Sequence, residues 1–297
     1  MTRETRILTT STPEMVVDLP SATGEGPLWN QRDLNVYWVD IPPGRLYRFD
    51  PESGENTVAY QHNASIGGYT FQADGSILLF CAKGQILRWR EEEITTVVHE
   101  IPEESGGRFN DVIAGPDGHV FCGTMPTANG QARLYRLNLD GSLTTLFDDV
   151  GLSNGFGFSP DNRTMYHTDT NKRVIYRLDY ALGTGEISNR RVVVQVPAGE
   201  GAPDGMATDA EGAIWSARWD GHAIFKYSPE GDVLGKVLLP VRKVSSLTFG
   251  GDDLGTAYVT TAGGGDRGTV EGMHAGSLYR IDLGVKGRPA FLSRIGM

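Results

Sequence analysis

A four-residue pattern that recurs six times along the chain restricts its possible folds more than any other feature. The pattern is an aliphatic, an aromatic, a basic and an apolar residue, and Leu87 is its one non-aromatic second position. The six copies span residues 46–49, 86–89, 134–137, 175–178, 224–227 and 278–281. Each copy follows a turn and a strand-like run, so the repeating unit is much longer than the pattern itself.

The complete unit contains short runs of Val, Ile, Tyr, Trp, Phe and Thr, which favour pleated sheet. The turns at the start of the units are 41 to 50 residues apart, and most units contain four such runs. Four strands in a period of about 45 residues are typical of a β-propeller blade. The sequence therefore predicts an all-β, six-bladed β-propeller with four-stranded antiparallel blades, formed by residues 1–297 as a single domain.

Two further features support a ring of blades. No amphipathic helix pattern separates the strand-like runs, which argues against a parallel α/β sheet. A propeller must also join its last blade to its first. Residues 15–19, near the N-terminus, and residues 290–292, near the C-terminus, are apolar runs that we expect to share the last blade.

Charge and composition exclude several classes of partner. The net charge is −10 and no cluster of Lys and Arg is present, which argues against binding to nucleic acid or an anionic membrane. No run is apolar enough to span a membrane and residues 1–10 lack a signal-peptide core, so a soluble, cytoplasmic protein is predicted. Cys81 and Cys122 are interpreted as buried free thiols. Nothing in the sequence indicates an oligomeric state.

Four polar residues occupy one shared position of the repeat, seven residues before the centre of a turn. They are Glu25, Asn110, Asn154 and Asp204, and the other two repeats have Gly67 and Ser245 there. The first strand of each blade lines the central channel of a propeller. Residues at one offset in these strands are therefore expected to converge at one end of the channel.

Carboxylates that converge repel each other unless a cation lies between them. Oxygen ligands suit hard divalent ions such as Ca²⁺, Mg²⁺ or Mn²⁺. Taken singly, Glu25, Asn154 and Asp204 would each be read as turn or loop residues, and the shared offset is what favours a site. Asp111 could support the neighbouring Asn110 or form hydrogen bonds at a strand end, and the second interpretation is favoured. His167 is interpreted as a residue that does not bind a metal.

Several motifs resemble those of the SMP-30/gluconolactonase/regucalcin family, in the same order and over about the whole chain. They are Gly-Glu-Gly-Pro-Leu-Trp at 24–29, Arg-Phe-Asn-Asp at 108–111, Leu-Ser-Asn-Gly at 152–155 and Pro-Asp-Gly-Met at 203–206. The resemblance implies a six-bladed propeller that opens small sugar lactones with one divalent metal ion.

The resemblance also implies roles for individual residues. Glu25, Asn154 and Asp204 match the metal ligands of the family, and Asp204 also matches its proposed general base. Arg108 and Asn110 match residues that contact the substrate. Some members have an acidic substrate contact in the loop that here spans residues 126–131, which contains no acid.

Within that loop, Thr127 or Asn129 is expected to contact the substrate instead. The sequence leaves open whether the metal is Ca²⁺, Mg²⁺, Mn²⁺, Zn²⁺ or Fe²⁺. Two alternatives to a sugar lactonase are a hydrolase of organophosphates or other esters at the same site, and a calcium-binding propeller without enzymatic activity.

Overall fold

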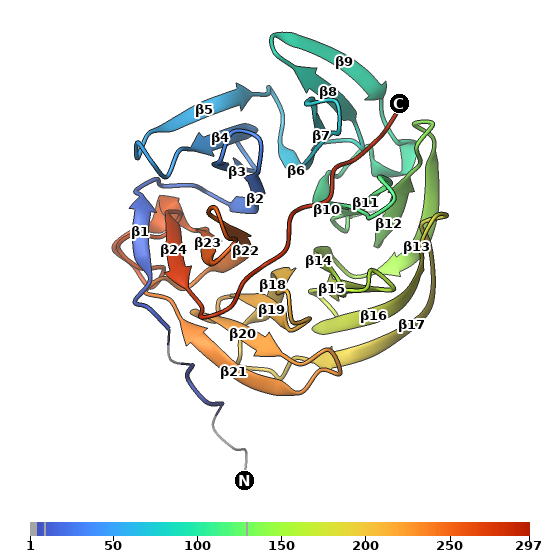
Figure 1. Cartoon of the computed structure of the whole chain (residues 1–297). Helices are drawn as coiled ribbons and strands as arrows, with labels where there is room; N and C mark the ends of the chain where they lie inside the picture. The colour runs from blue at the N-terminus through green and yellow to red at the C-terminus, as the bar shows by residue number, and fades with distance from the viewer. Residues whose placement is uncertain (1–4, 9, 129) are drawn as a thin grey trace.

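The computed structural model describes residues 5–8, 10–128 and 130–297. These residues form 24 strands and two short 3-10 helices, η1 (Pro102–Glu104) and η2 (Gly264–Asp266). The strands make six four-stranded antiparallel sheets, which Figure 1 shows as blades around a central axis. The prediction of an all-β, six-bladed propeller is confirmed. In the described part of the chain, no helix is long and apolar enough to cross a membrane.

The four strands of each blade run in order from the channel to the outside of the ring. The innermost strands are β2 (Gly24–Asn30), β6 (Ile66–Phe71), β10 (Phe109–Ala114), β14 (Ser153–Phe158), β18 (Ala202–Thr208) and β22 (Val244–Gly250). The second strands are β3 (Asn35–Asp40), β7 (Ile77–Cys81), β11 (Val120–Thr124), β15 (Thr164–Asp169), β19 (Ile214–Trp219) and β23 (Thr256–Thr261).

The recurrent four-residue pattern lies in the third strand of each blade. These strands are β4 (Arg45–Phe49), β8 (Ile86–Arg90), β12 (Ala132–Leu137), β16 (Val174–Ala181), β20 (Ala223–Tyr227) and β24 (Leu278–Asp282). The outermost strands are β5 (Asn56–Gln61), β9 (Glu93–Val98), β13 (Leu143–Val150), β17 (Glu186–Gln195), β21 (Val233–Leu238) and, in the last blade, β1 (Glu14–Val17).

Strand β1 closes the ring by pairing antiparallel with β24, with Met15 opposite Tyr279. The prediction that the N-terminal run completes the last blade is therefore confirmed. The prediction for residues 290–292 is wrong, because this segment forms no strand. Pro289, just before it, has no backbone N–H for a strand ladder, and the Phe291 ring packs edge-on against Phe158 of β14 at 5.7 Å.

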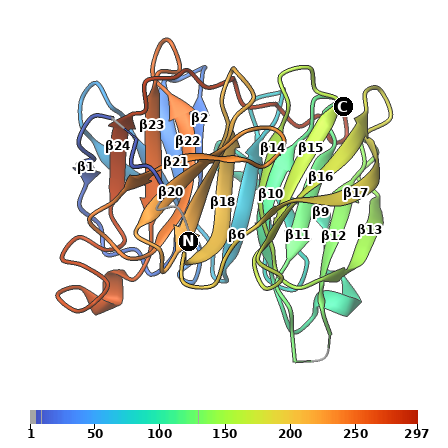
Figure 2. The same cartoon turned by 90° about the horizontal axis from the view of Figure 1, so that it is seen from below.

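The C-terminal segment after β24 instead crosses one end of the ring (Figure 1). Ala210, after β18, donates its N–H to Lys286 O at 2.8 Å, and Ser293 donates to Phe71 O of β6 at 2.9 Å. Figure 2 shows this segment at the opposite end of the ring from η1 and η2. The segment therefore joins blades that lie far apart around the ring.

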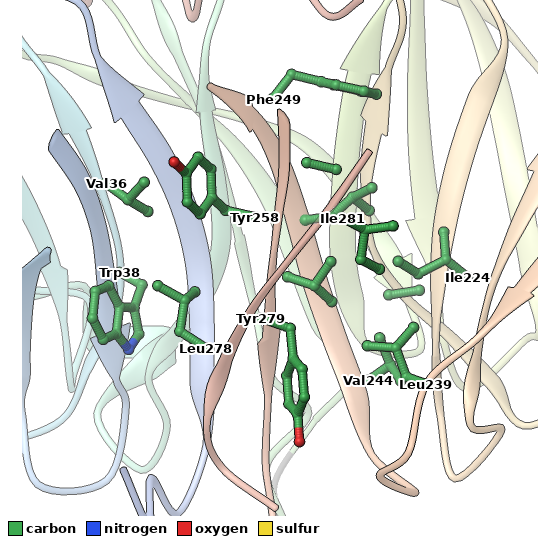
Figure 3. Close-up of a cluster of buried hydrophobic side chains, with 14 of the residues drawn as sticks. Val36, Trp38, Ile224, Leu239, Val244, Phe249, Tyr258, Leu278, Tyr279 and Ile281 are labelled. Carbon is green, nitrogen blue, oxygen red and sulfur yellow. The ribbon is translucent and has the colours of Figure 1, made fainter. Parts of the chain in front are cut away.

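Apolar side chains fill the interfaces between blades. One cluster combines Trp38 of β3, Ile224 of β20 and Leu278 of β24, which belong to three different blades (Figure 3). Each is at most 1 % exposed, and burying a side chain of this size contributes about 1.5–3 kcal/mol. Cys81 and Cys122 are buried free thiols, as predicted. Burial raises the pKa of Cys81 to about 12.

Each innermost strand changes register against its neighbour near its beginning. In β2 the pairing passes from Glu25 with Val39 directly to Leu28 with Tyr37, and the other five innermost strands shift at the equivalent place. Such β-bulges bend a strand and redirect its side chains. The repeat position predicted from the sequence therefore lies in or directly beside a bulge, at one end of the channel.

Candidate active site

The three predicted cation ligands lie near the beginning of β2, β14 and β18, in three blades. Glu25, Asn154 and Asp204 are only 4, 5 and 3 % exposed. Burial, followed by the charges of Asp111 and Asp204, raises the pKa of Glu25 well above its usual range. Burial and Asp111 also raise the pKa of Asp204, whereas the Asn154 side chain lowers it. The fold thus brings the three side chains close enough to influence each other's pKa, directly or through a neighbour. We call these residues the electrostatic group. Their role as cation ligands stays a prediction.

Asp111 belongs to the same electrostatic group, although the sequence interpretation favoured a hydrogen-bonding role at a strand end. Its Oδ1 is buried with no hydrogen-bond partner among the described residues, so this oxygen makes none of the hydrogen bonds expected of a residue at a strand end. Burial raises the pKa of Asp111 to about 7, with Arg108 opposing the shift. The β10 bulge leaves both Asn110 and Asp111 out of register with β11, so a second side chain is redirected there.

The charges and free oxygen atoms of the group fit a hard divalent cation. Three carboxyl groups interact there with the guanidinium of Arg108, and Arg218 also acts on Asp204. The carboxyl groups outnumber these two cations, and an excess of buried negative charge costs several kcal/mol. Oδ1 of Asn154 is also buried without a partner in the described part of the chain. No cluster of three or more His, Cys, Asp or Glu with metal-site geometry occurs among the described residues. The candidate set therefore needs the amide oxygen of Asn154.

Arg108 and Asn110 form a connected pair at this site. Nη1 of Arg108 donates to Asn110 Oδ1 at 2.7 Å and to Phe109 O at 2.8 Å. Asn110 Nδ2 in turn donates to Ser153 O at 2.9 Å. Burial lowers the pKa of Arg108, and the charges of Glu25, Asp111 and Asp204 oppose that shift. The pair is thereby held in one orientation beside the carboxylates.

Thr127, from the loop of residues 126–131, lies next to the segment that carries Arg108. Thr127 N donates to Gly130 O at 3.0 Å. A Cβ atom on Gly107 would lie only 2.8 Å from Thr127 Cγ2, so the absence of a side chain at Gly107 permits this close approach. Thr127 therefore lies near Arg108, as a substrate contact requires. Asn129, the other residue predicted from this loop, lies outside the described residues.

His167 supports the site from the second strand of its blade. Its Nε2 lies 2.8 Å from Ser153 Oγ, and its ring stacks on Phe156 at 4.8 Å. His167 is fully buried, and burial lowers its pKa to about 4. It therefore stays neutral over most of the accessible pH range and helps to position Ser153, whose carbonyl holds Asn110.

This low pKa predicts a pH-dependent loss of stability. An unfolded histidine takes up a proton near pH 6.5, so between about pH 6.5 and 4 the unfolded chain binds the extra proton and folding becomes less favourable. Urea unfolding of the metal-free protein should show wild type losing roughly 2–3 kcal/mol relative to His167→Gln from pH 7.5 to 4.5. A difference between the two proteins that does not vary with pH would contradict this expectation.

Comparison with known proteins identifies a matching family, similar sequences and a similar solved structure. Residues 23–263 match the family described as SMP-30/gluconolactonase/LRE-like region. The chain belongs to this family. It is 44 % identical to pentonolactonase XacC of Haloferax volcanii, over 94 % of this chain and 97 % of that protein. It is 35 % identical to 6-deoxy-6-sulfogluconolactonase of Pseudomonas putida, over 84 and 87 %. A solved regucalcin from Agrobacterium tumefaciens has the same fold, with a TM-score of 0.90, 24 % identity and coverage of 98 and 100 %.

In this family member the channel continues beyond the site as a cavity of about 140 Å³. Its wall combines Asp111 with apolar side chains from several blades, such as Phe156 and Met206, and residues 288–291 line it as well. Asp111 thus lies between the polar site and the apolar channel. This position accounts for the strong effect of burial on its pKa.

Proposed function

We propose that this chain is a divalent-metal-dependent sugar lactonase, which hydrolyses an aldonolactone to the sugar acid. The observation that carries the proposal is the buried group of Glu25, Asp204 and the unpartnered Oδ1 of Asn154, next to the guanidinium of Arg108. The names of two relatives, a pentonolactonase and a sulfogluconolactonase, support the same class of reaction.

Glu25, Asn154 and Asp204 would hold the cation through oxygen atoms. Asp111 adds negative charge next to them, which favours a divalent ion over a monovalent one. Ca²⁺, Mg²⁺, Mn²⁺, Zn²⁺ or Fe²⁺ bound there would supply a Lewis acid for the lactone carbonyl.

Asp204 acts as the general base in this proposal. Its carboxylate accepts a proton from the water molecule that attacks the lactone carbonyl carbon. The bond between the carbonyl carbon and the ring oxygen then breaks, and the proton returns to that oxygen, giving a hydroxy acid. Burial raises the pKa of Asp204, and the charges of Arg108 and Arg218 oppose that rise. A bound cation would oppose it further and favour the ionised carboxylate that this role requires.

Arg108 and Asn110 bind the substrate. Asn110 uses its Oδ1 and one Nδ2 hydrogen within the protein, which leaves its second amide hydrogen for a sugar hydroxyl. The Arg108 guanidinium, fixed through Nη1, can donate to the oxyanion that develops on the carbonyl. A positioned donor of this kind typically contributes roughly 3 kcal/mol to the transition state. Thr127, and Asn129 from the same loop, are proposed to contact the sugar.

A panel of lactones and metals tests the proposal. The purified chain is stripped with chelator and assayed by acid release on pentonolactones first, then on other aldonolactones, with each of the five cations. We expect hydrolysis well above the spontaneous rate, lost with chelator and restored by at least one cation, because the buried carboxylates require a counter-charge.

Two other outcomes would contradict the proposal and favour one of the two alternative functions. Faster hydrolysis of organophosphate esters than of every lactone would favour an ester hydrolase at the same site. A cation-dependent rise in Tm without turnover of any substrate would favour a calcium-binding propeller. The spontaneous hydrolysis of each lactone at the assay pH, measured without protein, is the baseline for both comparisons.

A further inference from the structure

Thr170, immediately after β15, connects two of the proposed cation ligands. Asn154 Nδ2 donates to Thr170 Oγ1 at 3.0 Å. Thr170 Oγ1 donates in turn to Pro203 O at 2.7 Å, and Pro203 directly precedes Asp204. The Thr170 backbone is itself held, because its N–H donates to Leu152 O at 3.0 Å. One half-buried hydroxyl thus lies between a ligand of blade β14–β17 and the strand that carries a ligand of blade β18–β21.

The hydrogen count of this hydroxyl determines how the Asn154 amide is oriented. A threonine hydroxyl has one hydrogen, and a backbone carbonyl can only accept a hydrogen bond. The hydrogen of Thr170 is therefore committed to Pro203 O, and Oγ1 presents only a lone pair to Asn154. Asn154 must present its NH₂ group to that lone pair, so its Oδ1 is turned away from Thr170. This resolves the usual ambiguity between amide oxygen and nitrogen.

We infer that Thr170 is a positioning residue for the cation site, an inference that rests on the function proposed above. It holds the Asn154 amide by its NH₂ group, which leaves Oδ1, buried and unpartnered in the described structure, free to bind a cation. It also ties Pro203 to Asn154, which sets the spacing between the ligands of two blades. Without the hydroxyl, the amide is free to rotate and present NH₂, which repels a cation.

The test measures cation affinity rather than turnover. Thr170→Val keeps the shape of the side chain and removes its hydroxyl, whereas Thr170→Ser keeps the hydroxyl. Isothermal titration calorimetry of the chelator-stripped chain with Ca²⁺ and Mn²⁺ should show Kd raised about 10- to 100-fold in Thr170→Val, the usual effect of losing an outer-shell partner. Thr170→Ser should stay within about threefold of wild type.

Thr208→Val is a matched control for the general cost of losing a threonine hydroxyl. Thr208 Oγ1 also donates to a backbone carbonyl, Phe158 O at 2.8 Å, but at the far end of β18. Its replacement should lower the Tm of the metal-free protein to a similar degree and leave Kd unchanged. Thr170→Ala is a second hydroxyl-free variant should Thr170→Val prove too unstable to purify.

A double-mutant cycle isolates the orientation of the amide. In Asn154→Asp both side-chain oxygens can face the cation, so orientation no longer matters, and adding Thr170→Val should change Kd by less than about threefold. Wild-type affinity in Thr170→Val alone, or an equal effect in both backgrounds, would overturn the inference. A wild-type chain that binds neither cation would instead overturn the proposed metal-dependent function, and the inference with it.

Discussion

Replacing Asp204 with asparagine is expected to lower kcat for lactone hydrolysis at least 10³-fold. The substitution keeps the shape of the side chain but removes both the proposed base, whose contribution is typically about 10²–10⁴-fold, and one charged cation ligand. Cation affinity should fall at the same time. The metal-free variant should be more stable than wild type, because burial raises the pKa of Asp204 and the neutral amide avoids the cost of a buried charge.

This combination of lost activity and gained stability distinguishes a functional carboxylate from a structural one. Asp209, just beyond the other end of β18, is the matched control. It accepts hydrogen bonds from Ala213 N at 2.8 Å and Trp215 Nε1 at 2.9 Å, so Asp209→Asn should lose stability and keep its activity. Steady-state kinetics, calorimetric cation titration and melting in chelator give the three readouts. An Asp204→Asn protein with bound metal and more than a tenth of the wild-type rate would rule out the assignment.

Deleting residues 285–297 is expected to lower Tm substantially while leaving the site intact. The segment buries Ile295, and Arg294 N donates to Gly118 O at 2.9 Å. Arg288 Nη1 donates to Ser159 O at 2.8 Å. A buried aliphatic side chain and several net hydrogen bonds together contribute about 5 kcal/mol. For a chain of this length, that corresponds to a fall of roughly 8 °C in Tm.

Removal of Met297 alone is the control, because this residue is 58 % exposed and its loss should leave Tm within about 1 °C, as for most surface changes. Melting curves of the metal-free proteins give the comparison. Lactone hydrolysis below the melting transition should survive the longer deletion. The segment crosses the end of the ring opposite η1 and η2 (Figure 2), whereas Arg108 of the candidate site follows η1 in the sequence. A truncated protein that melts with wild type would show that the segment does not hold the blades together.

The fold could be predicted from the sequence because its evidence is local and repeated. Each blade contains the same order of turns and strands within its own 41 to 50 residues, so one pattern was observed six times. The convergence of Glu25, Asn154 and Asp204 followed from the same periodicity. Residues at one offset in a repeated unit reach one radius and height when the units are arranged in a ring.

Other features had no such periodic signal. Asp111 lies one residue beyond the shared position, and only the two-residue bulge of β10 brings it into the site. Thr170 follows β15, whereas the two residues that it connects lie on β14 and β18. The C-terminal segment resembles a strand in composition, yet it packs across the end of the ring because Pro289 interrupts a ladder and its apolar side chains find an interface there.

The sequence by itself determined the number of blades, their strand order and the three residues that meet at the channel, because these depend on short-range patterns repeated along the chain. Only the tertiary structure decided that the Asn154 NH₂ group faces Thr170, that Asp111 joins Glu25 and Asp204, and that the C-terminal segment packs across one end of the ring. Those features depend on contacts between blades, which exist only once the ring has closed and which leave no regular spacing in the sequence.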